Sequence, residues 1–96
     1  MIAAPAGGCA SRKVTVANQR GLHARAAAKL VKVASQYDAE VTVTKDGVSV
    51  SGSSIMGLMM LAAVPGTDLQ LSAEGPDAKS VLDALEQLVA DKFDED

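Results

Sequence analysis

The stretch AEVTVTKDGVSVSG, residues 39–52, consists of two alternating segments separated by the dipeptide Asp46-Gly47. Alternation with a period of two is typical of β-strands with one buried face, and Asp-Gly favours a tight hairpin turn. We therefore predict a β-hairpin in the middle of the chain. Its alternating apolar residues are four valines: Val41, Val43, Val48 and Val50.

On the N-terminal side of this hairpin, the pattern predicts a strand followed by a helix. RKVTVAN, residues 12–18, alternates with Val14 and Val16 on one face, and NQRG then interrupts it. From Ala24 to Gln36 the pattern changes to the spacing of an amphipathic helix. The apolar stripe of that helix is Ala27, Leu30, Val31 and Ala34.

On the C-terminal side, the pattern predicts helix, strand and helix again. SSIMGLMMLAAVPG, residues 53–66, reads as a short helix that Ser53 or Ser54 caps and Pro65-Gly66 ends. TDLQLSAEG, residues 67–75, alternates as a strand with Leu69, Leu71 and Ala73 inward. Pro76 and Asp77 suit the first turn of the last helix. That helix has the apolar stripe Val81, Leu82, Leu85, Leu88 and Val89.

The predicted order β-α-β-β-α-β-α indicates an α+β fold of the split βαβ type. Such a fold is an open-faced sandwich, in which a four-stranded antiparallel sheet carries three helices on one face. A chain of 96 residues suffices for one such domain. We assign residues 12–92 to the domain, 1–11 to a flexible N-terminal tail and 93–96 to an acidic C-terminal tail. With one Phe, one Tyr and no Trp, the core must be aliphatic.

The opening segment MIAAPAGGCAS has the small residues of a lipoprotein cleavage site before Cys9. It has neither a basic start nor a sustained apolar run, so we expect a frayed tail instead. No run approaches the ~20 apolar residues of a membrane span. One cysteine and one histidine provide neither an internal disulfide nor a zinc site. These observations predict a cytoplasmic protein with no membrane association, metal or cofactor.

Charge is distributed unevenly along the chain. Residues 1–67 carry seven Lys or Arg against three acidic residues, whereas residues 68–96 carry two Lys against nine acidic residues. Four of the basic residues lie within residues 20–32, around the only histidine, His23. This pattern favours an acidic protein partner or a phosphate near His23. It disfavours nucleic acid, which requires a broader basic face or aromatic side chains.

The motif GLHARAA, residues 21–27, places His23 at the start of the first helix. A neutral imidazole is nucleophilic near pH 7 and can accept a phosphoryl group. The first-turn N–H groups, including those of Ala24 and Ala26, could bind the phosphoryl oxygens together with the Arg25 guanidinium. Small residues at this helix start would leave the histidine open to a partner. The simpler interpretation, a surface histidine that only caps the helix, is also consistent with the spacing.

Taken in order, GLHARAA, SSIMGLMML (53–61) and AEGPDAKSVLDALEQLV (73–89) resemble the HPr family of bacterial phosphocarrier proteins. The resemblance covers about residues 12–92, and the split βαβ order is also that family's fold. It implies that His23 accepts a phosphoryl group from Enzyme I, through Nδ1, and passes it to an EIIA-type protein, with Arg25 beside the site. Many members have proline where this chain has Ala26, so the helix start here lacks proline's fixed φ.

The resemblance also assigns roles around the second helix. Ser54 matches the serine that HPr kinase/phosphorylase modifies in some members, although a capping role would also explain it. Ile55, Met56 and Met59 cannot all be buried, and we expect an exposed subset, including Met56, to dock partners. The alanine after Arg25 and the FDED ending look more like nitrogen-branch or alphaproteobacterial members. We therefore expect the carrier to belong to a regulatory branch. We also expect it to be a monomer and not itself an enzyme.

Two other functions fit the sequence. In one, His23 is unused and the chain is a regulatory binding module that docks through its Met-rich helix. In the other, the chain is a small-molecule sensor of the split βαβ type, which would form a stable dimer. Phosphorylation of a monomer would exclude both.

Overall fold

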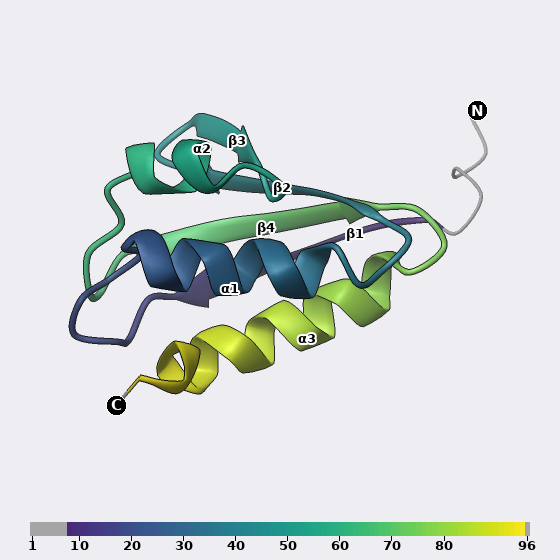
Figure 1. Cartoon of the computed structure of the whole chain (residues 1–96). Helices are drawn as coiled ribbons and strands as arrows, with labels where there is room; N and C mark the ends of the chain where they lie inside the picture. The colour runs from purple at the N-terminus through teal and green to yellow at the C-terminus, as the bar shows by residue number, and fades with distance from the viewer. Residues whose placement is uncertain (1–7, 96) are drawn as a thin grey trace.

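A computed structural model describes residues 8–95, and it has the predicted order of elements (Figure 1). The elements are β1 (Cys9–Thr15), α1 (Ala24–Ala34), β2 (Glu40–Lys45), β3 (Val48–Ser51), α2 (Ile55–Met60), β4 (Asp68–Glu74), α3 (Ala78–Ala90) and the short 3₁₀ turn η1 (Lys92–Asp94). None of the helices between residues 8 and 95 has both the length and the apolar character needed to cross a membrane.

The four strands form one antiparallel sheet in the order β1-β4-β2-β3. β4 pairs with a neighbour on each side, with Leu69 opposite Val14 of β1 and Leu71 opposite Val43 of β2. The helices lie on one face of this sheet, with α1 between α2 and α3 (Figure 1). The predicted fold class, a split βαβ open-faced sandwich, is confirmed.

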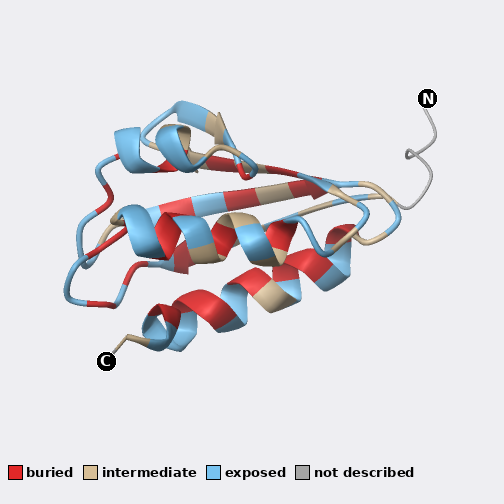
Figure 2. Ribbon diagram, viewed as in Figure 1, coloured by how far each residue is buried: buried red, intermediate tan, exposed pale blue. Residues whose placement is uncertain are grey.

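The core lies between the sheet and the helices, where the inward faces of both are buried (Figure 2). The alternation predicted for β4 is confirmed, since Leu69 and Leu71 are fully buried. The apolar stripe predicted for α3 is also buried. Leucine, valine and alanine supply nearly all of the core, as the composition requires. The exception is Phe93, an aromatic residue that is completely buried.

The central hairpin forms as predicted, but one of its strands is less buried than expected. Asp46 and Gly47 have φ of 49° and 83°, which are the positive angles of a type I′ turn. Val48 is 58% exposed and Val50 is only partly buried, so alternation in this strand does not bury Val48. β3 is an edge strand that pairs only with β2, and the helical layer does not cover its first residue.

The helix boundaries differ from the predicted ones by a few residues. α1 ends at Ala34, two residues before Gln36, with Ser35 as its C-cap. Pro76 and Asp77 precede α3, and the Asp77 carboxylate accepts a hydrogen bond from the Asp38 N–H (2.8 Å) instead of capping the helix.

The two tails are shorter than the sequence suggests. β1 begins at Cys9, which lies opposite Glu74, because β4 is long enough to pair with residues 9–11. The rest of the predicted N-terminal tail, residues 1–7, lies outside the described residues. At the other end, Phe93 packs in the core, so the expectation of a frayed segment from residue 93 is wrong for Phe93. Asp96 lies outside the described residues.

Candidate functional site

Gly21 shapes the loop that leads from β1 into α1. Its φ is +66°, and a side chain at this position would overlap the carbonyl oxygen of Ala63. The next residue, Leu22, donates its backbone N–H to that same oxygen (2.9 Å). The loop is therefore bound to the segment that follows α2, which only a glycine permits at this point.

His23 is the N-cap of α1. Its backbone is extended, with φ −77° and ψ −179°, and its carbonyl accepts the first helical hydrogen bond, from Ala27 (2.8 Å). Its Nδ1 accepts a hydrogen bond from the backbone N–H of Arg25 (3.2 Å). The lone pair of Nδ1 therefore points toward the helix N-terminus, where an anion is stabilised. Capping and anion chemistry thus coexist at this residue.

The other ring nitrogen of His23, Nε2, contacts the carboxylate of Glu95. The His23 side chain is 18% exposed and that of Glu95 is 11% exposed, so the contact is largely shielded from water. An ionised carboxylate only accepts hydrogen bonds. Nε2 therefore carries the proton in this pair, and Nδ1 retains the lone pair of the neutral ring.

Asn18 binds the other oxygen of Glu95 and is completely buried. Its amide nitrogen donates to Glu95 Oε1 (2.9 Å) and to the carbonyl of Gly21 (2.8 Å). Its amide oxygen has no hydrogen-bond partner among residues 8–95, which costs about 1–3 kcal/mol. The hydrogen bond from Asn18, more than that from His23, holds the pKa of Glu95 below its usual value, despite the desolvation that raises it.

A tight left-handed turn after α3 brings Glu95 to His23. Lys92, Phe93 and Asp94 all have positive φ, between 54° and 60°, so the right-handed path of α3 ends there. The buried ring of Phe93 holds this turn to the core. The ammonium of Lys29 on α1 donates to the Phe93 carbonyl oxygen (2.6 Å).

The other residues predicted around His23 differ in exposure. Ala24 and Arg25 are exposed, whereas Ala26 and Ala27 are completely buried in the core. The expectation that the small side chains of Ala26 and Ala27 open the histidine to partners is therefore wrong, because α1 packs through them. The backbone N–H groups of Ala24 and Ala26 precede the first helical hydrogen bond and are free of intrahelical partners.

Ser54 is the N-cap of α2, which resolves the choice between Ser53 and Ser54. Its hydroxyl oxygen accepts a hydrogen bond from the Gly57 N–H (2.9 Å). Ser53 is exposed and its hydroxyl is bonded to that of Ser51 (2.7 Å). Both hydroxyls thus have partners, and Ser54 is the less exposed of the two.

α2 presents an apolar surface, which we call the α2 patch, beside the first turns of α1 (Figure 1). Leu58 and Leu61 are buried beneath it. The exposed members of the patch are Ile55 (41%), Met56 (72%), Met59 (43%) and Met60 (78%). The three residues expected to include an exposed subset are all exposed, and the sequence interpretation missed Met60.

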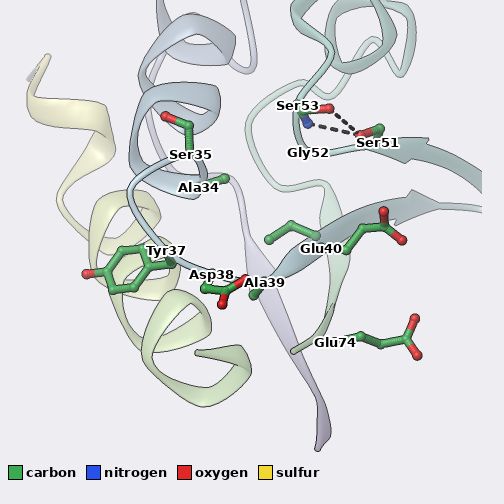
Figure 3. A pocket seen from close by; sticks show the side chains of 11 residues that line it. Ala34, Ser35, Tyr37, Asp38, Ala39, Glu40, Ser51, Gly52, Ser53 and Glu74 are labelled. Carbon is green, nitrogen blue, oxygen red and sulfur yellow. Dashed lines mark hydrogen bonds between the residues drawn. The ribbon is translucent and has the colours of Figure 1, made fainter. Parts of the chain in front are cut away.

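A surface hollow of about 570 Å³ lies at the far end of α1, between Ala34 and the start of β2 (Figure 3). An 11-residue helix is about 16 Å long, so this hollow is remote from His23. Its polar lining is acidic, with Asp38, Glu40 and Glu74. No group of three or more His, Cys, Asp or Glu within residues 8–95 is placed to hold a metal ion.

Sequence reasoning singled out His23 and Arg25 but not Asn18 and Glu95, which the structure brings to His23. Glu95 lies 72 positions after His23 in an acidic run that resembles a solvated tail. The one available signal was Phe93, a single aromatic residue among charged ones, which is unusual for a frayed end.

Comparison with known proteins gives the family of this chain. Residues 10–91 match the family model described as "PTS HPr component phosphorylation site". The phosphocarrier protein HPr of Pseudomonas aeruginosa is 49% identical over 84 residues, covering 86% of this chain and 93% of that protein. The phosphocarrier protein NPr of Shewanella violacea is 46% identical over 84 residues, covering 88% of this chain and 92% of that protein.

Solved structures agree as well. The crystal structure of HPr from Thermoanaerobacter tengcongensis superposes with a TM-score of 0.87 at 39% identity, covering 91% of this chain and 98% of that one. The sequence match and the shared fold both extend over nearly the whole chain. This chain therefore belongs to the HPr family of phosphocarrier proteins of the phosphotransferase system.

Proposed function

We propose that His23 is the residue of this phosphocarrier that receives and donates the phosphoryl group. Enzyme I, charged by phosphoenolpyruvate, is the donor, and an EIIA-type protein is the acceptor. The observation that carries the proposal is the orientation of the His23 ring. Nδ1 faces the N-terminus of α1, while Nε2 is held by Glu95. The nucleophilic nitrogen thus lies where an incoming phosphoryl group is stabilised.

The transfer step is an in-line displacement. The lone pair of Nδ1 forms a bond to phosphorus, the bond from phosphorus to the donor's nitrogen breaks, and its electron pair returns to the donor's ring. In the free protein the backbone N–H of Arg25 donates to Nδ1. Once Nδ1 is bonded to phosphorus, this N–H becomes available to a phosphoryl oxygen. The protein contributes positioning and charge stabilisation, without a metal or other cofactor.

Arg25 and the helix backbone stabilise the phosphoryl oxygens. Arg25 is exposed at the first turn, so its guanidinium is free to approach an anion at Nδ1. The N–H groups of Ala24 and Ala26 add two further donors. Because Ala26 replaces the proline of many members, this site has one more N–H than theirs.

The α2 patch is the docking surface for both partners in this proposal. Ile55, Met56 and Met59 lie in it, beside the helix that bears His23. Flexible methionine side chains suit a surface that must fit two unlike partners.

Ser54 is the site of regulatory phosphorylation in this proposal, with an HPr kinase/phosphorylase as its enzyme. A phosphate there would add nearly two negative charges at the edge of the apolar α2 patch. Docking to that patch would then weaken. The same hydroxyl caps α2, so modification also changes the start of the helix.

We assign the carrier to a regulatory, nitrogen-type branch and expect it to act as a cytoplasmic monomer. An NPr protein matches this chain at nearly the same identity as an HPr protein, 46% against 49%. Transfer from phosphorylated protein to EIIA proteins of the nitrogen and sugar types, followed over time, decides between the branches. Gel filtration with light scattering gives the oligomeric state.

The decisive test is the intact mass after incubation with phosphoenolpyruvate, Mg²⁺ and an Enzyme I proven active on its own carrier. We expect one acid-labile phosphoryl addition to the wild-type protein and none to His23→Ala. Arg25→Ala serves as the companion variant, with slower but detectable phosphorylation. No addition to the wild-type protein would favour the rival function, a regulatory module that binds partners through the α2 patch.

A further inference from the structure

We infer that Glu95 is a positioning residue for His23, which fixes the proton on Nε2 and neutralises the charge that the ring acquires when Nδ1 is phosphorylated. Asn18 anchors Glu95 in this role. The inference rests on the proposed function of His23 and adds to it a residue outside the GLHARAA motif. Its tests are chosen so that the two can fail separately.

Both oxygens of the Glu95 carboxylate are used, and by different partners. Oε2 contacts Nε2 of His23, and Oε1 accepts from the Asn18 amide at 2.9 Å. The same amide nitrogen also donates to the Gly21 carbonyl, so the active-site loop itself holds the anchor. A carboxylate whose two oxygens both have partners has little freedom to rotate. The His23 ring that it contacts therefore has little freedom to rotate either.

The chain reaches this position through an unfavourable turn that two contacts hold in place. The turn with three consecutive positive φ angles is unfavourable for residues other than glycine. Burial of Phe93 and the bond from Lys29 to its carbonyl oxygen hold the turn in place. Together these contacts place the Glu95 carboxylate, which is 11% exposed, against the histidine ring.

The electrostatic role follows from the transfer step. When Nδ1 forms its bond to phosphorus, no proton leaves the ring, and Nε2 keeps its hydrogen. The ring therefore gains one positive charge as the donor's ring loses one. A carboxylate that already accepts the Nε2 proton stabilises that charge without rearrangement, as a carboxylate does for a catalytic imidazole in other proteins.

Glu95 does not block the reacting nitrogen, Nδ1, because it contacts the other ring nitrogen, Nε2. Nδ1 faces the exposed first turn of α1, where Arg25 is accessible. The arrangement thus orients the ring and does not inhibit it, so removal of Glu95 must slow the transfer and not accelerate it.

The first test is a spectroscopic one that needs no partner protein. His23 is the only histidine, so the ring signals in an ¹⁵N-labelled sample belong to it without ambiguity. We expect a slowly exchanging, downfield Nε2 proton in the wild-type protein and its loss in Glu95→Ala. Asp94→Asn, a charge-removing change at the neighbouring exposed residue, is the matched control and should keep the signal. The same signal in Glu95→Ala as in wild type would overturn the inference.

The second test is the rate of phosphorylation by Enzyme I. Glu95→Gln keeps the length of the side chain but removes its charge, and we expect a rate lower by about tenfold, with Asp94→Asn within about twofold of wild type. Urea unfolding curves that show both variants fully folded under the assay conditions exclude a loss of folding as the cause. An unchanged rate in Glu95→Gln would overturn the charge-neutralising role. If the wild-type protein is not phosphorylated, the proposed function fails. The spectroscopic test still shows whether Glu95 positions the His23 ring.

Discussion

Gly21 illustrates how a single residue without a side chain determines the geometry of the loop before α1. Its positive φ and its close approach to Ala63 let the backbone of Leu22 bond to the segment after α2. That hydrogen bond holds the residue before His23, and His23 is the N-cap of α1.

We predict that Gly21→Ala lowers the free energy of unfolding by about 3 kcal/mol or more, since left-handed strain adds to a steric overlap. Gly47 also has a positive φ, but a side chain there meets nothing within 4 Å. Gly47→Ala is therefore the control, with a loss of about 1–2 kcal/mol from backbone strain alone. Urea unfolding measures both, and equal losses would contradict the role of the overlap.

His23 shows that one residue can bind two different partners through its two ring nitrogens. Nδ1 caps the helix and Nε2 contacts Glu95, so both ring nitrogens have partners before any substrate binds. The interpretation as a capping histidine and the interpretation as a nucleophile are therefore compatible.

At the scale of the element, α2 is too short to be stable on its own. It has six residues, and its stability comes from its cap and from the burial of Leu58. Its exposed methionines contribute little to that burial, which leaves them available for binding.

We predict that Ser54→Ala lowers stability by about 1 kcal/mol, because the Gly57 N–H loses its capping partner. Ser53→Ala should change stability by less than about 0.5 kcal/mol, since its hydroxyl is exposed. The measurement is the urea midpoint of each variant. A larger effect at Ser53 than at Ser54 would mean that Ser53 is the functional cap.

We also predict that the double variant Met56→Gln and Met60→Gln lowers kcat/KM for phosphorylation by Enzyme I about tenfold. These are the most exposed residues of the α2 patch, so the change should leave the unfolding midpoint nearly unaltered. Lys79→Gln on α3, also exposed, is the control and should retain wild-type kinetics. Unchanged kcat/KM in the double variant would place the docking surface elsewhere.

At the scale of the whole molecule, the fold brings together charges that are far apart in the sequence. Arg12 of β1 forms ion pairs with Asp83 (2.8 Å) and Glu86 (2.9 Å) of α3. These pairs raise the pKa of the Arg12 guanidinium, chiefly through its hydrogen bond to Asp83. The basic and acidic halves of the sequence are thus partly neutralised against each other.

The C-terminal contact with His23 should make stability depend on pH in a defined window. The pKa of Glu95 is lowered in the folded protein, first by the hydrogen bond from Asn18 and then by His23 and the charge of Arg20, against the desolvation that raises it. Its stabilising contribution is therefore complete above the ordinary pKa of a glutamate and is lost as pH falls through the lower folded pKa.

We predict that the free energy of unfolding of the wild-type protein decreases more steeply between pH 5 and pH 3 than that of Glu95→Gln. The variant lacks this titration, so the two curves should converge at the acidic end. Urea titrations at several pH values measure both curves, and parallel curves would contradict the lowered pKa.

The order of elements, the inward faces of β4 and α3, and the position of His23 at a helix start could all be predicted from the sequence. These are local properties, since alternation, helical spacing and turn residues act over a few positions. The exposure of Val48, the burial of Ala26 and Ala27 in the core, and the contacts of Asn18 and Glu95 around His23 become visible only in the folded chain. These features depend on contacts between segments that are distant in the sequence, such as Asn18 and Glu95, which are 77 positions apart. A pattern over a few residues carries no information about such contacts.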